Sequence, residues 1–266
     1  MKQPLVQMRG IVKKFPGVVA NDHVDLDLFA GEIHALLGEN GSGKSTIMSV
    51  LAGLYKPDAG EILVDGAPVA FASPRDAIEA GIGMVHQHFK LVEPFTVAQN
   101  IQLSERGGAF LLSDAAIRQE IKAFETRFGL AVDPDAPVWQ LSVGEKQRVE
   151  IVRMLYRGSR VLILDEPTAV LTPQETAELF VNMKKMAAAG CAVVFITHKM
   201  NEVQEVADRV TVLRGGKVTG VCNPQEESNA SLSKLMVLEM LLSIHFCAAA
   251  CIRTWSSGGR VWAFTK

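Results

Sequence analysis

The segment GENGSGKST at residues 38–46 constrains the fold of this chain more than any other. Before it, EIHALLG at 32–38 is typical of a strand that runs into the glycine loop. After it, four apolar residues recur at helical spacing, namely Ile47, Val50, Leu51 and Leu54. Gly53 lies near the end of this predicted helix, where a C-terminal stop is expected. The sequence therefore predicts a strand, a glycine loop and a helix in succession.

The glycine loop has the form Gly, four residues, Gly-Lys-Ser, which is typical of a phosphate-binding loop. Glycines allow backbone N–H groups to point inward at phosphate oxygens, and the helix that begins at Lys44 directs its positive dipole end toward them. We expect Lys44 to reach the β and γ phosphates of a nucleotide and Ser45 to ligate Mg²⁺. The alternative is a loop that only turns the chain, and the flanking strand and helix argue against it.

The composition is that of a folded protein, since 48% of the 266 residues are hydrophobic and 21% are charged. We expect one domain with two lobes. A formal net charge of −2 argues against a chain that coats nucleic acid or an anionic membrane. The four cysteines show no paired metal-ligand pattern, and the N-terminal segment does not resemble a signal peptide. We therefore expect reduced thiols in a cytosolic compartment. No apolar run approaches the length of about 20 residues that spans a bilayer, so any membrane crossing is expected from another subunit.

Four further segments predict strands. VDLDL at 24–28 alternates strictly, which indicates a strand with one solvated face in an antiparallel lobe. EILVDG at 61–66 predicts a short strand that closes on an Asp-Gly turn. VLIL at 161–164 and VVFIT at 193–197 are apolar throughout, as in central parallel strands that are covered on both faces.

A helical lobe is predicted in the middle of the chain. One apolar stripe there consists of Ile117, Ile121, Phe124 and Phe128, and Ser113 or Asp114 is the candidate N-cap. The predicted fold class is therefore α/β. It has a mostly parallel sheet with an antiparallel β lobe, and an inserted helical subdomain at about 90–155.

Two adjacent carboxylates, Asp165 and Glu166, follow the predicted strand at 161–164. Because consecutive strand residues point to opposite sides, the two cannot have the same role. We assign Asp165 to the Mg²⁺ shell and Glu166 to the water that attacks the γ phosphate. A solvated acidic strand end is the alternative.

His198 follows the strand at 193–197 and could donate a hydrogen bond to the γ phosphate, although a strand-end histidine is more often structural.

Weaker candidates lie nearer the N-terminus. Gln87, within VHQHF, carries little weight alone because most glutamines are only solvated. His86 and His88 flank it at strand spacing and could share one side, but no third metal ligand is visible nearby. Phe15 precedes a Pro-Gly turn and could stack on an adenine ring, although a lone aromatic residue there usually belongs to the core.

A second small turn, LSVGEKQ at 141–147, precedes another predicted helix. Ser142 lies before that helix and Gly144 in its first turn, so N–H groups and a hydroxyl are available to an anion. This helix belongs to the inserted lobe, whereas the core anchors the chain's own nucleotide. We therefore expect the turn to contact a nucleotide held by a second subunit, in a C₂ dimer that sandwiches two ATP molecules.

Five ordered motifs resemble those of ABC ATPases. They are the Walker A loop at 38–45, the Q-loop at Gln87, the signature at 141–147, Walker B at 161–166 and the H-loop at His198. Longer segments are most similar to the importer ATPases for nucleosides and simple sugars, namely KKFPGVVANDHVDL, GMVHQHFKLVEPFTVAQNI and DEPTAVLTPQE.

The resemblance implies a role for each matching residue. ATP contacts are implied for Phe15, Gly38, Glu39, Asn40, Gly41, Ser42, Gly43, Lys44, Ser45 and Thr46. Contacts with the partner's ATP are implied for Leu141, Ser142, Val143, Gly144 and Glu145. Mg²⁺ is assigned to Ser45, Gln87 and Asp165, and catalysis to Glu166 as base with Gln87 and His198 at the γ phosphate. The family usually carries an Asp near Thr172, and its absence here puts communication between the two dimer sites in doubt.

The function implied by the resemblance is ATP hydrolysis that drives an importer for a small solute, with ATP and Mg²⁺ as cofactors. The implied location is the cytoplasmic face of the cell membrane. Expected partners are a second nucleotide-binding domain, transmembrane permease subunits and, indirectly, a substrate-binding protein, with no nucleic acid. Two alternatives stay open: a soluble ABC ATPase that acts on nucleic acid or ribosomes, and a truncated fragment that binds ATP without catalysis.

The resemblance covers residues 5–237, which we expect to form the nucleotide-binding domain. Similar importer ATPases commonly continue into a second cassette, but residues 238–266 differ in composition and hold two of the three tryptophans. A truncated or frameshifted reading and a native extra helix are both open for this tail. His245, Cys247 and Cys251 invite a metal interpretation, but a fourth ligand is lacking.

Overall fold

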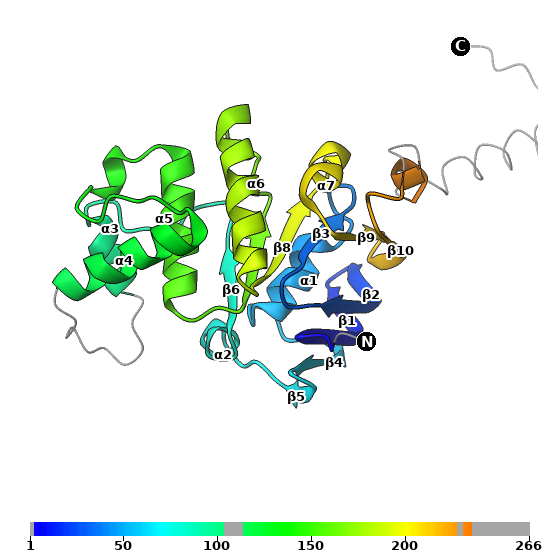
Figure 1. Cartoon of the computed structure of the whole chain (residues 1–266). Helices are drawn as coiled ribbons and strands as arrows, with labels where there is room; N and C mark the ends of the chain where they lie inside the picture. Colours follow the sequence, from blue (N-terminus) through cyan, green and yellow to red (C-terminus); the bar gives the residue numbers. More distant parts are fainter. Residues whose placement is uncertain (1–2, 104–113, 228–230, 236–266) are drawn as a thin grey trace, which may run out of the picture.

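The computed structural model of the chain describes residues 3–103, 114–227 and 231–235 (Figure 1). Two β-sheets lie at its centre with helices around them, in the predicted α/β fold class. The candidate N-cap Ser113 and the side chain of Asp114 lie outside the described part. The same holds for the candidate ligands of the tail, His245, Cys247 and Cys251.

The larger sheet has six strands in the order β10-β9-β3-β8-β7-β6. Neighbouring strands are parallel except at one edge, where β10 runs antiparallel to β9. The strands are β3 (Ile33–Leu37), β6 (Ile82–Val85), β7 (Val161–Asp165), β8 (Ala192–Thr197), β9 (Arg209–Arg214) and β10 (Lys217–Cys222). The two continuous apolar runs form β7 and β8 near the middle of this sheet, which confirms their prediction as central parallel strands.

The smaller sheet is antiparallel throughout, with the order β2-β1-β4-β5. Its strands are β1 (Val6–Phe15), β2 (Val18–Leu28), β4 (Ala59–Val64) and β5 (Ala67–Val69). The alternating segment at 24–28 is the second half of β2, where Val24, Leu26 and Leu28 are buried, so the predicted one-sided strand is confirmed. The predicted Asp-Gly turn joins β4 to β5 with φ of 52° at Asp65 and 80° at Gly66, as expected when two residues close a hairpin.

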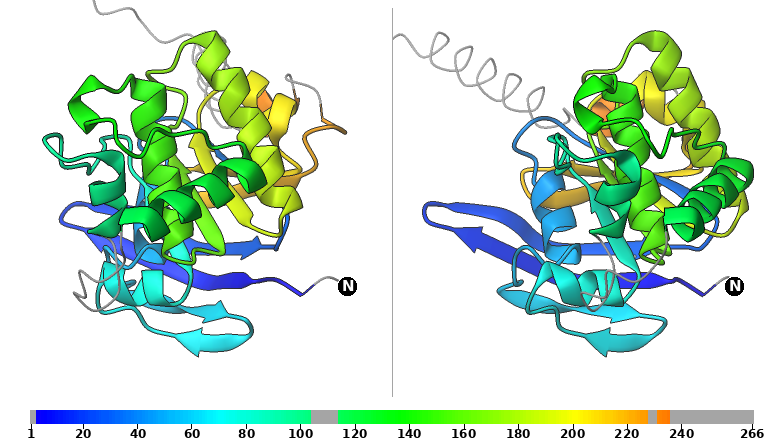
Figure 2. Two further views of the ribbon diagram at one scale, coloured as in Figure 1. Left: turned by 60° about the vertical axis from the view of Figure 1, so that its left-hand side comes forward. Right: turned by 90° about the vertical axis from the view of Figure 1, so that its left-hand side faces the viewer.

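Helices cover both sides of the larger sheet (Figures 1 and 2). They are α1 (Lys44–Leu51), α2 (Pro74–Glu79), α3 (Val97–Gln102), α4 (Asp114–Phe128), α5 (Val143–Tyr156), α6 (Pro173–Ala188) and α7 (Met200–Val206), with a short 3₁₀ helix at Val138–Gln140. Helices α3, α4 and α5 contact one another and form a helical subdomain on the side away from the smaller sheet. None of the helices in the described ranges combines the length and apolar character needed to cross a bilayer.

Alternate residues of each central strand enter different cores. In β3, Ile33 and Leu37 belong to a core shared with helices α3 to α7, whereas Leu36 belongs to a core shared with α1 and the smaller sheet. Strands β7 and β8 are divided in the same way. Because both faces are covered, these strands are apolar except for the buried, hydrogen-bonded His34 and Thr197 and for Asp165 at the end of β7. Close packing on both faces holds the strand ends in place for the site below.

The C-terminus of α1 differs in one respect from the prediction. The helix ends at Leu51, and Gly53 follows in a left-handed conformation with φ of 71°. This glycine confirms the predicted stop. Leu54, which was predicted to continue the apolar face, lies beyond the helix with an exposed fraction of 39%, because the chain has already turned away at Gly53.

Candidate functional site

Four adjacent strands place in one row the residues predicted to bind phosphate and Mg²⁺ and to catalyse hydrolysis. In the order β3-β8-β7-β6, the strands run parallel, so their carboxyl ends meet at the same edge of the sheet. Strand β3 leads into the glycine loop at 38–46, and β8 leads into His198. Strand β7 ends on Asp165 with Glu166 next, and Gln87 follows β6. Residues that are far apart in the sequence are thereby brought together.

The glycine loop curls around the ammonium group of Lys44. A Cβ atom on Gly38 would clash with the carbonyl oxygen of Leu213, and Gly43 has φ of 99°, so both positions require glycine. The buried Nζ of Lys44 donates to the carbonyl oxygens of Gly38 (2.7 Å) and Glu39 (2.8 Å), and burial lowers the pKa of Lys44. Phosphate oxygens are stronger acceptors for this charged donor than neutral carbonyls.

A buried asparagine fastens the glycine loop to the antiparallel sheet. Asn21 in β2 is fully buried, and its Nδ2 donates to the carbonyl oxygen of Gly43 (3.1 Å). Within the described residues, the buried hydroxyl of Ser42 has no hydrogen-bond partner. A bound phosphate oxygen fits as that partner, because buried hydroxyls are normally paired.

Phe15, the predicted adenine platform, lies at the end of β1 opposite Val18 of β2. Its ring meets Tyr55 edge to face at 5.4 Å between centroids, and the Nζ of Lys13 lies 5.5 Å from its centroid. Asp58 holds this hairpin, since its Oδ2 accepts from the N–H of Lys14 at 2.6 Å. Strand β2 therefore connects the two parts of the site, because it pairs with Phe15 and also carries Asn21, which is hydrogen-bonded to the glycine loop.

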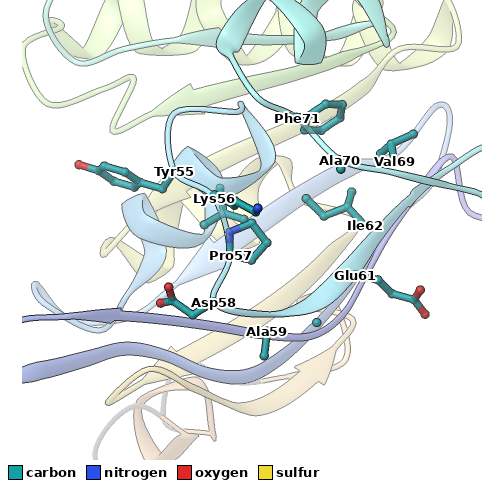
Figure 3. A pocket seen from close by; sticks show the side chains of 12 residues that line it. Tyr55, Lys56, Pro57, Asp58, Ala59, Glu61, Ile62, Val69, Ala70 and Phe71 are labelled. Carbon is teal, nitrogen blue, oxygen red and sulfur yellow. The ribbon is translucent and has the colours of Figure 1, made fainter.

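A cavity of about 320 Å³ lies behind the loop at 55–58, between the end of α1 and strands β4 and β5 (Figure 3). Its lining includes Ile62, Val69 and Phe71, with Tyr55 and Asp58 at the side of the loop. None of the residues predicted to contact nucleotide lines it, so this cavity is separate from the site.

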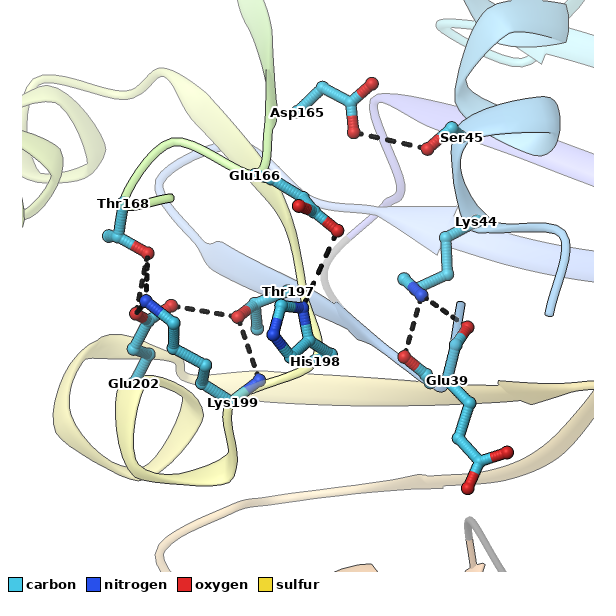
Figure 4. Close-up of polar contacts among 11 residues, drawn as sticks. Glu39, Lys44, Ser45, Asp165, Glu166, Thr168, Thr197, His198, Lys199 and Glu202 are labelled. Atoms are coloured by element: carbon cyan, nitrogen blue, oxygen red, sulfur yellow. Dashed lines mark hydrogen bonds and ion pairs between the residues drawn. The ribbon is translucent and has the colours of Figure 1, made fainter. Parts of the chain in front are cut away.

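Ser45 and Asp165 approach each other from opposite elements (Figure 4). The Oγ of Ser45, in the first turn of α1, donates to Oδ1 of Asp165 at the end of β7 (3.2 Å). Burial raises the pKa of Asp165. A carboxylate and a hydroxyl that converge in this way are the hard oxygen ligands that Mg²⁺ prefers, and its charge would offset the burial of Asp165. The residues therefore fit a magnesium ion.

Glu166 differs from the predicted strand geometry. Strand β7 ends at Asp165, and Glu166 has φ of 44°, so a left-handed backbone turn sets its direction instead of the strand pleat. Such a conformation is strained for a residue with a side chain. The Oε1 of Glu166 lies 3.6 Å from Nδ1 of His198 (Figure 4). The carboxylate and imidazole are thus adjacent at the strand ends.

Gln87 lines a small cavity together with Asp165 and Glu166. Its side chain is exposed, and the strand before it ends at Val85. The predicted strand spacing of His86 and His88 is therefore wrong, because both residues lie beyond β6. No group of three or more metal-ligating His, Cys, Asp or Glu side chains occurs in the part of the chain that the structure describes.

The signature turn is formed as predicted at the start of α5. Ser142 is the N-cap, its Oγ accepts from the N–H of Glu145 (3.2 Å), and Oε2 of Glu145 accepts from the N–H of Ser142 (2.8 Å). Gly144 lies against the carboxylate of Glu175 on α6, where a Cβ atom would clash. Among the described residues, no hydrogen bond or ion pair joins Leu141–Glu145 to the glycine loop, so the fold does not bring these two motifs together.

Several residues of the site escaped prediction. Besides Asn21, the Nε2 of buried Gln147 donates to the carbonyl oxygen of Pro167 (2.9 Å), which ties α5 to the turn after β7. Glu202 is buried behind Glu166 and His198. Asn21 and Glu202 are single polar residues without a short-range pattern, so only their burial in the fold distinguishes them from solvated ones. Gln147 lies in the signature segment, but its contact with Pro167 depends on the fold.

The fold and this row of residues define a phosphate-loop nucleotide-binding protein of the α/β class. The chain belongs to the ABC transporter family, whose pattern matches residues 21–169.

Curated relatives include the glucose import ATP-binding protein TsgD13 of Haloferax volcanii, which is 46% identical over 89% of this chain and 48% of the relative. The nucleoside import ATP-binding protein NupA of Lactococcus lactis is 48% identical over 236 residues, 88% of this chain and 47% of the relative. The chain thus spans about half the length of the curated relatives it matches. A solved dimeric bacterial ABC transporter cassette, MJ0796, matches with a TM-score of 0.71 at 26% identity, over 82% of this chain and 98% of that one.

Proposed function

We propose that this chain binds and hydrolyses ATP as the motor subunit of an ABC importer for a nucleoside or simple sugar. One observation carries the proposal: the glycine loop, His198, Asp165 with Glu166, and Gln87 follow adjacent parallel strands at one sheet edge. The names of the relatives support the solute class, since they are ATP-binding proteins of glucose and nucleoside import.

Residues of the chain divide the work of hydrolysis between them. The glycine loop and Lys44 bind the phosphates, and Phe15 stacks on the adenine ring. Ser45, Asp165 and Gln87 would hold Mg²⁺, which supplies neutralisation of phosphate charge when bound. Glu166 accepts the proton of the attacking water, while His198 and Gln87 orient that water and the γ phosphate.

The proposed active unit is a dimer. Among the described residues, the signature turn at Leu141–Glu145 contacts Glu175 of α6 and makes no hydrogen bond or ion pair with its own glycine loop. Each turn therefore serves the nucleotide of a second cassette. Two structures of the MJ0796 cassette are dimeric, one of them bound to ADP and Pi, which supports this arrangement.

The remaining partners are permease subunits in the membrane, with a substrate-binding protein acting through them. The chain would lie at the cytoplasmic face of that complex. We place the nucleotide-binding domain at residues 5–237 and its helical subdomain at about 90–155, with residues 238–266 as a separate tail.

Two substitutions test the assignment of roles. Glu166→Gln should keep ATP binding and lower turnover by about 100-fold or more, because the base is lost while the phosphate contacts remain. Lys44→Ala should weaken ATP binding itself, because the ammonium group is lost from the loop. Calorimetric ATP titration and steady-state phosphate release measure the two effects separately.

Glu166→Gln should also accumulate an ATP-bound dimer in size-exclusion chromatography, because hydrolysis no longer opens it. Turnover equal to that of the parent protein in this variant would refute the base assignment. Glu205→Gln, on the exposed side of α7, is the matched control that should change neither measurement.

A further inference from the structure

A buried carboxylate lies behind the site in contact with both strand ends that carry Glu166 and His198 (Figure 4). Glu202 on α7 has an exposed fraction of 8%. Its Oε1 accepts from Oγ1 of Thr168 at 2.6 Å, and its Oε2 accepts from Oγ1 of Thr197 at 2.8 Å. The two oxygens of one carboxylate thus hold two separate segments of the chain.

Both threonines are adjacent to the catalytic pair in sequence. Thr197 directly precedes His198, and Thr168 lies two residues after Glu166. The N–H of Lys199 donates to Oγ1 of Thr197 at 3.1 Å, which closes the turn that carries His198. A shift of Glu202 would therefore move the backbone on both sides of the 3.6 Å contact between Glu166 and His198.

The charge of this buried carboxylate is also balanced locally. The Nζ of Lys199 lies 2.9 Å from Oε1 of Glu202 and 3.2 Å from Oγ1 of Thr168. A buried carboxylate is costly unless it is paired and hydrogen-bonded, and here both conditions are met. Strands β7 and β8 are already joined by their backbone ladder, and the directional hydrogen bonds of Glu202 fix Thr168 and Thr197 relative to each other.

We propose that Glu202 is a positioning residue that sets the distance and orientation between Glu166 and His198 through Thr168 and Thr197. This rests on the proposed function, in which these two side chains face the γ phosphate. Glu202 touches none of the residues assigned to phosphate binding in the described part of the chain. Its effect therefore belongs to the chemical step and not to nucleotide affinity.

Glu202→Gln is the primary test, because glutamine keeps the shape but offers only one acceptor oxygen to two hydroxyl donors. We expect kcat to fall roughly 100-fold, as for a misplacement of about 1 Å at a reacting centre, with ATP affinity unchanged. Glu205→Gln on the same helix is the control and should match the parent protein. A purely structural role would lower the melting temperature and the active fraction but leave kcat per active site unchanged.

Two further sets of variants test whether Glu202 acts on turnover through Thr197 and His198. Thr197→Val should resemble Glu202→Gln, whereas Thr197→Ser, which keeps the hydroxyl, should recover most of the turnover. Glu202→Gln combined with His198→Ala should be little slower than His198→Ala alone, because both changes disable one unit. Parental kcat in Glu202→Gln, or full additivity of the double variant, would overturn the proposal.

A readout without turnover separates this proposal from the proposed function. The imidazole resonances of His198, assigned by their loss in His198→Ala, should shift in Glu202→Gln and stay in place in Glu205→Gln. If the parent protein fails to hydrolyse ATP, the proposed function is refuted, and the spectra still decide the positioning role. Unchanged His198 resonances in Glu202→Gln would refute it.

Discussion

At the scale of single residues, the aromatic ring of Phe15 is held by an aromatic neighbour, and the hairpin that carries it is held by a carboxylate. Tyr55 meets the ring edge to face, and Lys13 lies near its centroid. Asp58 accepts from the backbone of Lys14 and from Nζ of Lys13, so the hairpin end is attached to the loop after α1. These contacts hold the ring in place before any nucleotide binds, which limits the entropy lost on binding.

Phe15→Ala should weaken ATP binding by about tenfold, since stacking of a base on an aromatic side chain contributes about 1–3 kcal/mol. Phe15→Tyr should bind ATP like the parent protein. Because the ring meets only the base, the affinity for inorganic tripolyphosphate should be the same in all three proteins. Isothermal titration with both ligands measures this, and equal losses for ATP and tripolyphosphate would show that Phe15 acts on the fold instead.

At the scale of elements, α5 is attached to the segment that follows Gln87. Glu150 on α5 is buried, and its Oε1 accepts from the N–H of Lys90 (2.8 Å). Arg153, one turn further on, donates to the carbonyl oxygen of Lys90 (2.7 Å) and pairs with Glu150 (3.0 Å). Both polar groups of the Lys90 backbone are therefore bound to the helix that begins with the signature turn, so the two segments should move together.

Glu150→Ala should destabilise the fold by about 3 kcal/mol, because it removes a buried carboxylate that binds the Lys90 N–H and leaves the partly buried guanidinium of Arg153 without its charge partner. Glu178→Ala, which removes an exposed pair with Arg148, should cost no more than about 1 kcal/mol. Urea unfolding without nucleotide measures both. A loss in Glu150→Ala as small as in Glu178→Ala would mean that Arg153 finds other partners and that α5 is not held by this pair.

Elements were predictable from sequence where local chemistry decides them. The glycine loop, the N-cap Ser142 and the apolar strands β7 and β8 each follow from a few adjacent residues. The order β3-β8-β7-β6 does not, because it depends on pairing between segments such as Ile33 and Val193 that are distant in the chain. The left-handed turn at Glu166 and the buried Glu202 were missed for the same reason, since both are set by tertiary contacts.

At the scale of the whole molecule, the row of strand ends and the signature turn belong to different parts of one chain. The core carries Lys44 and Glu166, whereas Ser142 begins α5 of the helical subdomain. Within the described residues, the turn contacts Glu175 of α6 rather than the glycine loop. A complete site as proposed therefore needs Lys44 from one chain and Ser142 from another.

ATPase activity per chain should therefore rise with protein concentration until the dimer is saturated, because the complete site forms only on association.

A mixture of two inactive variants is a sharper test of the shared site. Lys44→Ala and Ser142→Arg should each be inactive, but a mixed dimer contains one site with both groups intact. Half of randomly formed dimers are mixed and have one of two sites, so an equal mixture should recover about a quarter of the parental rate. Activity that is independent of concentration, together with a mixture as inactive as its components, would show that one chain holds the complete site.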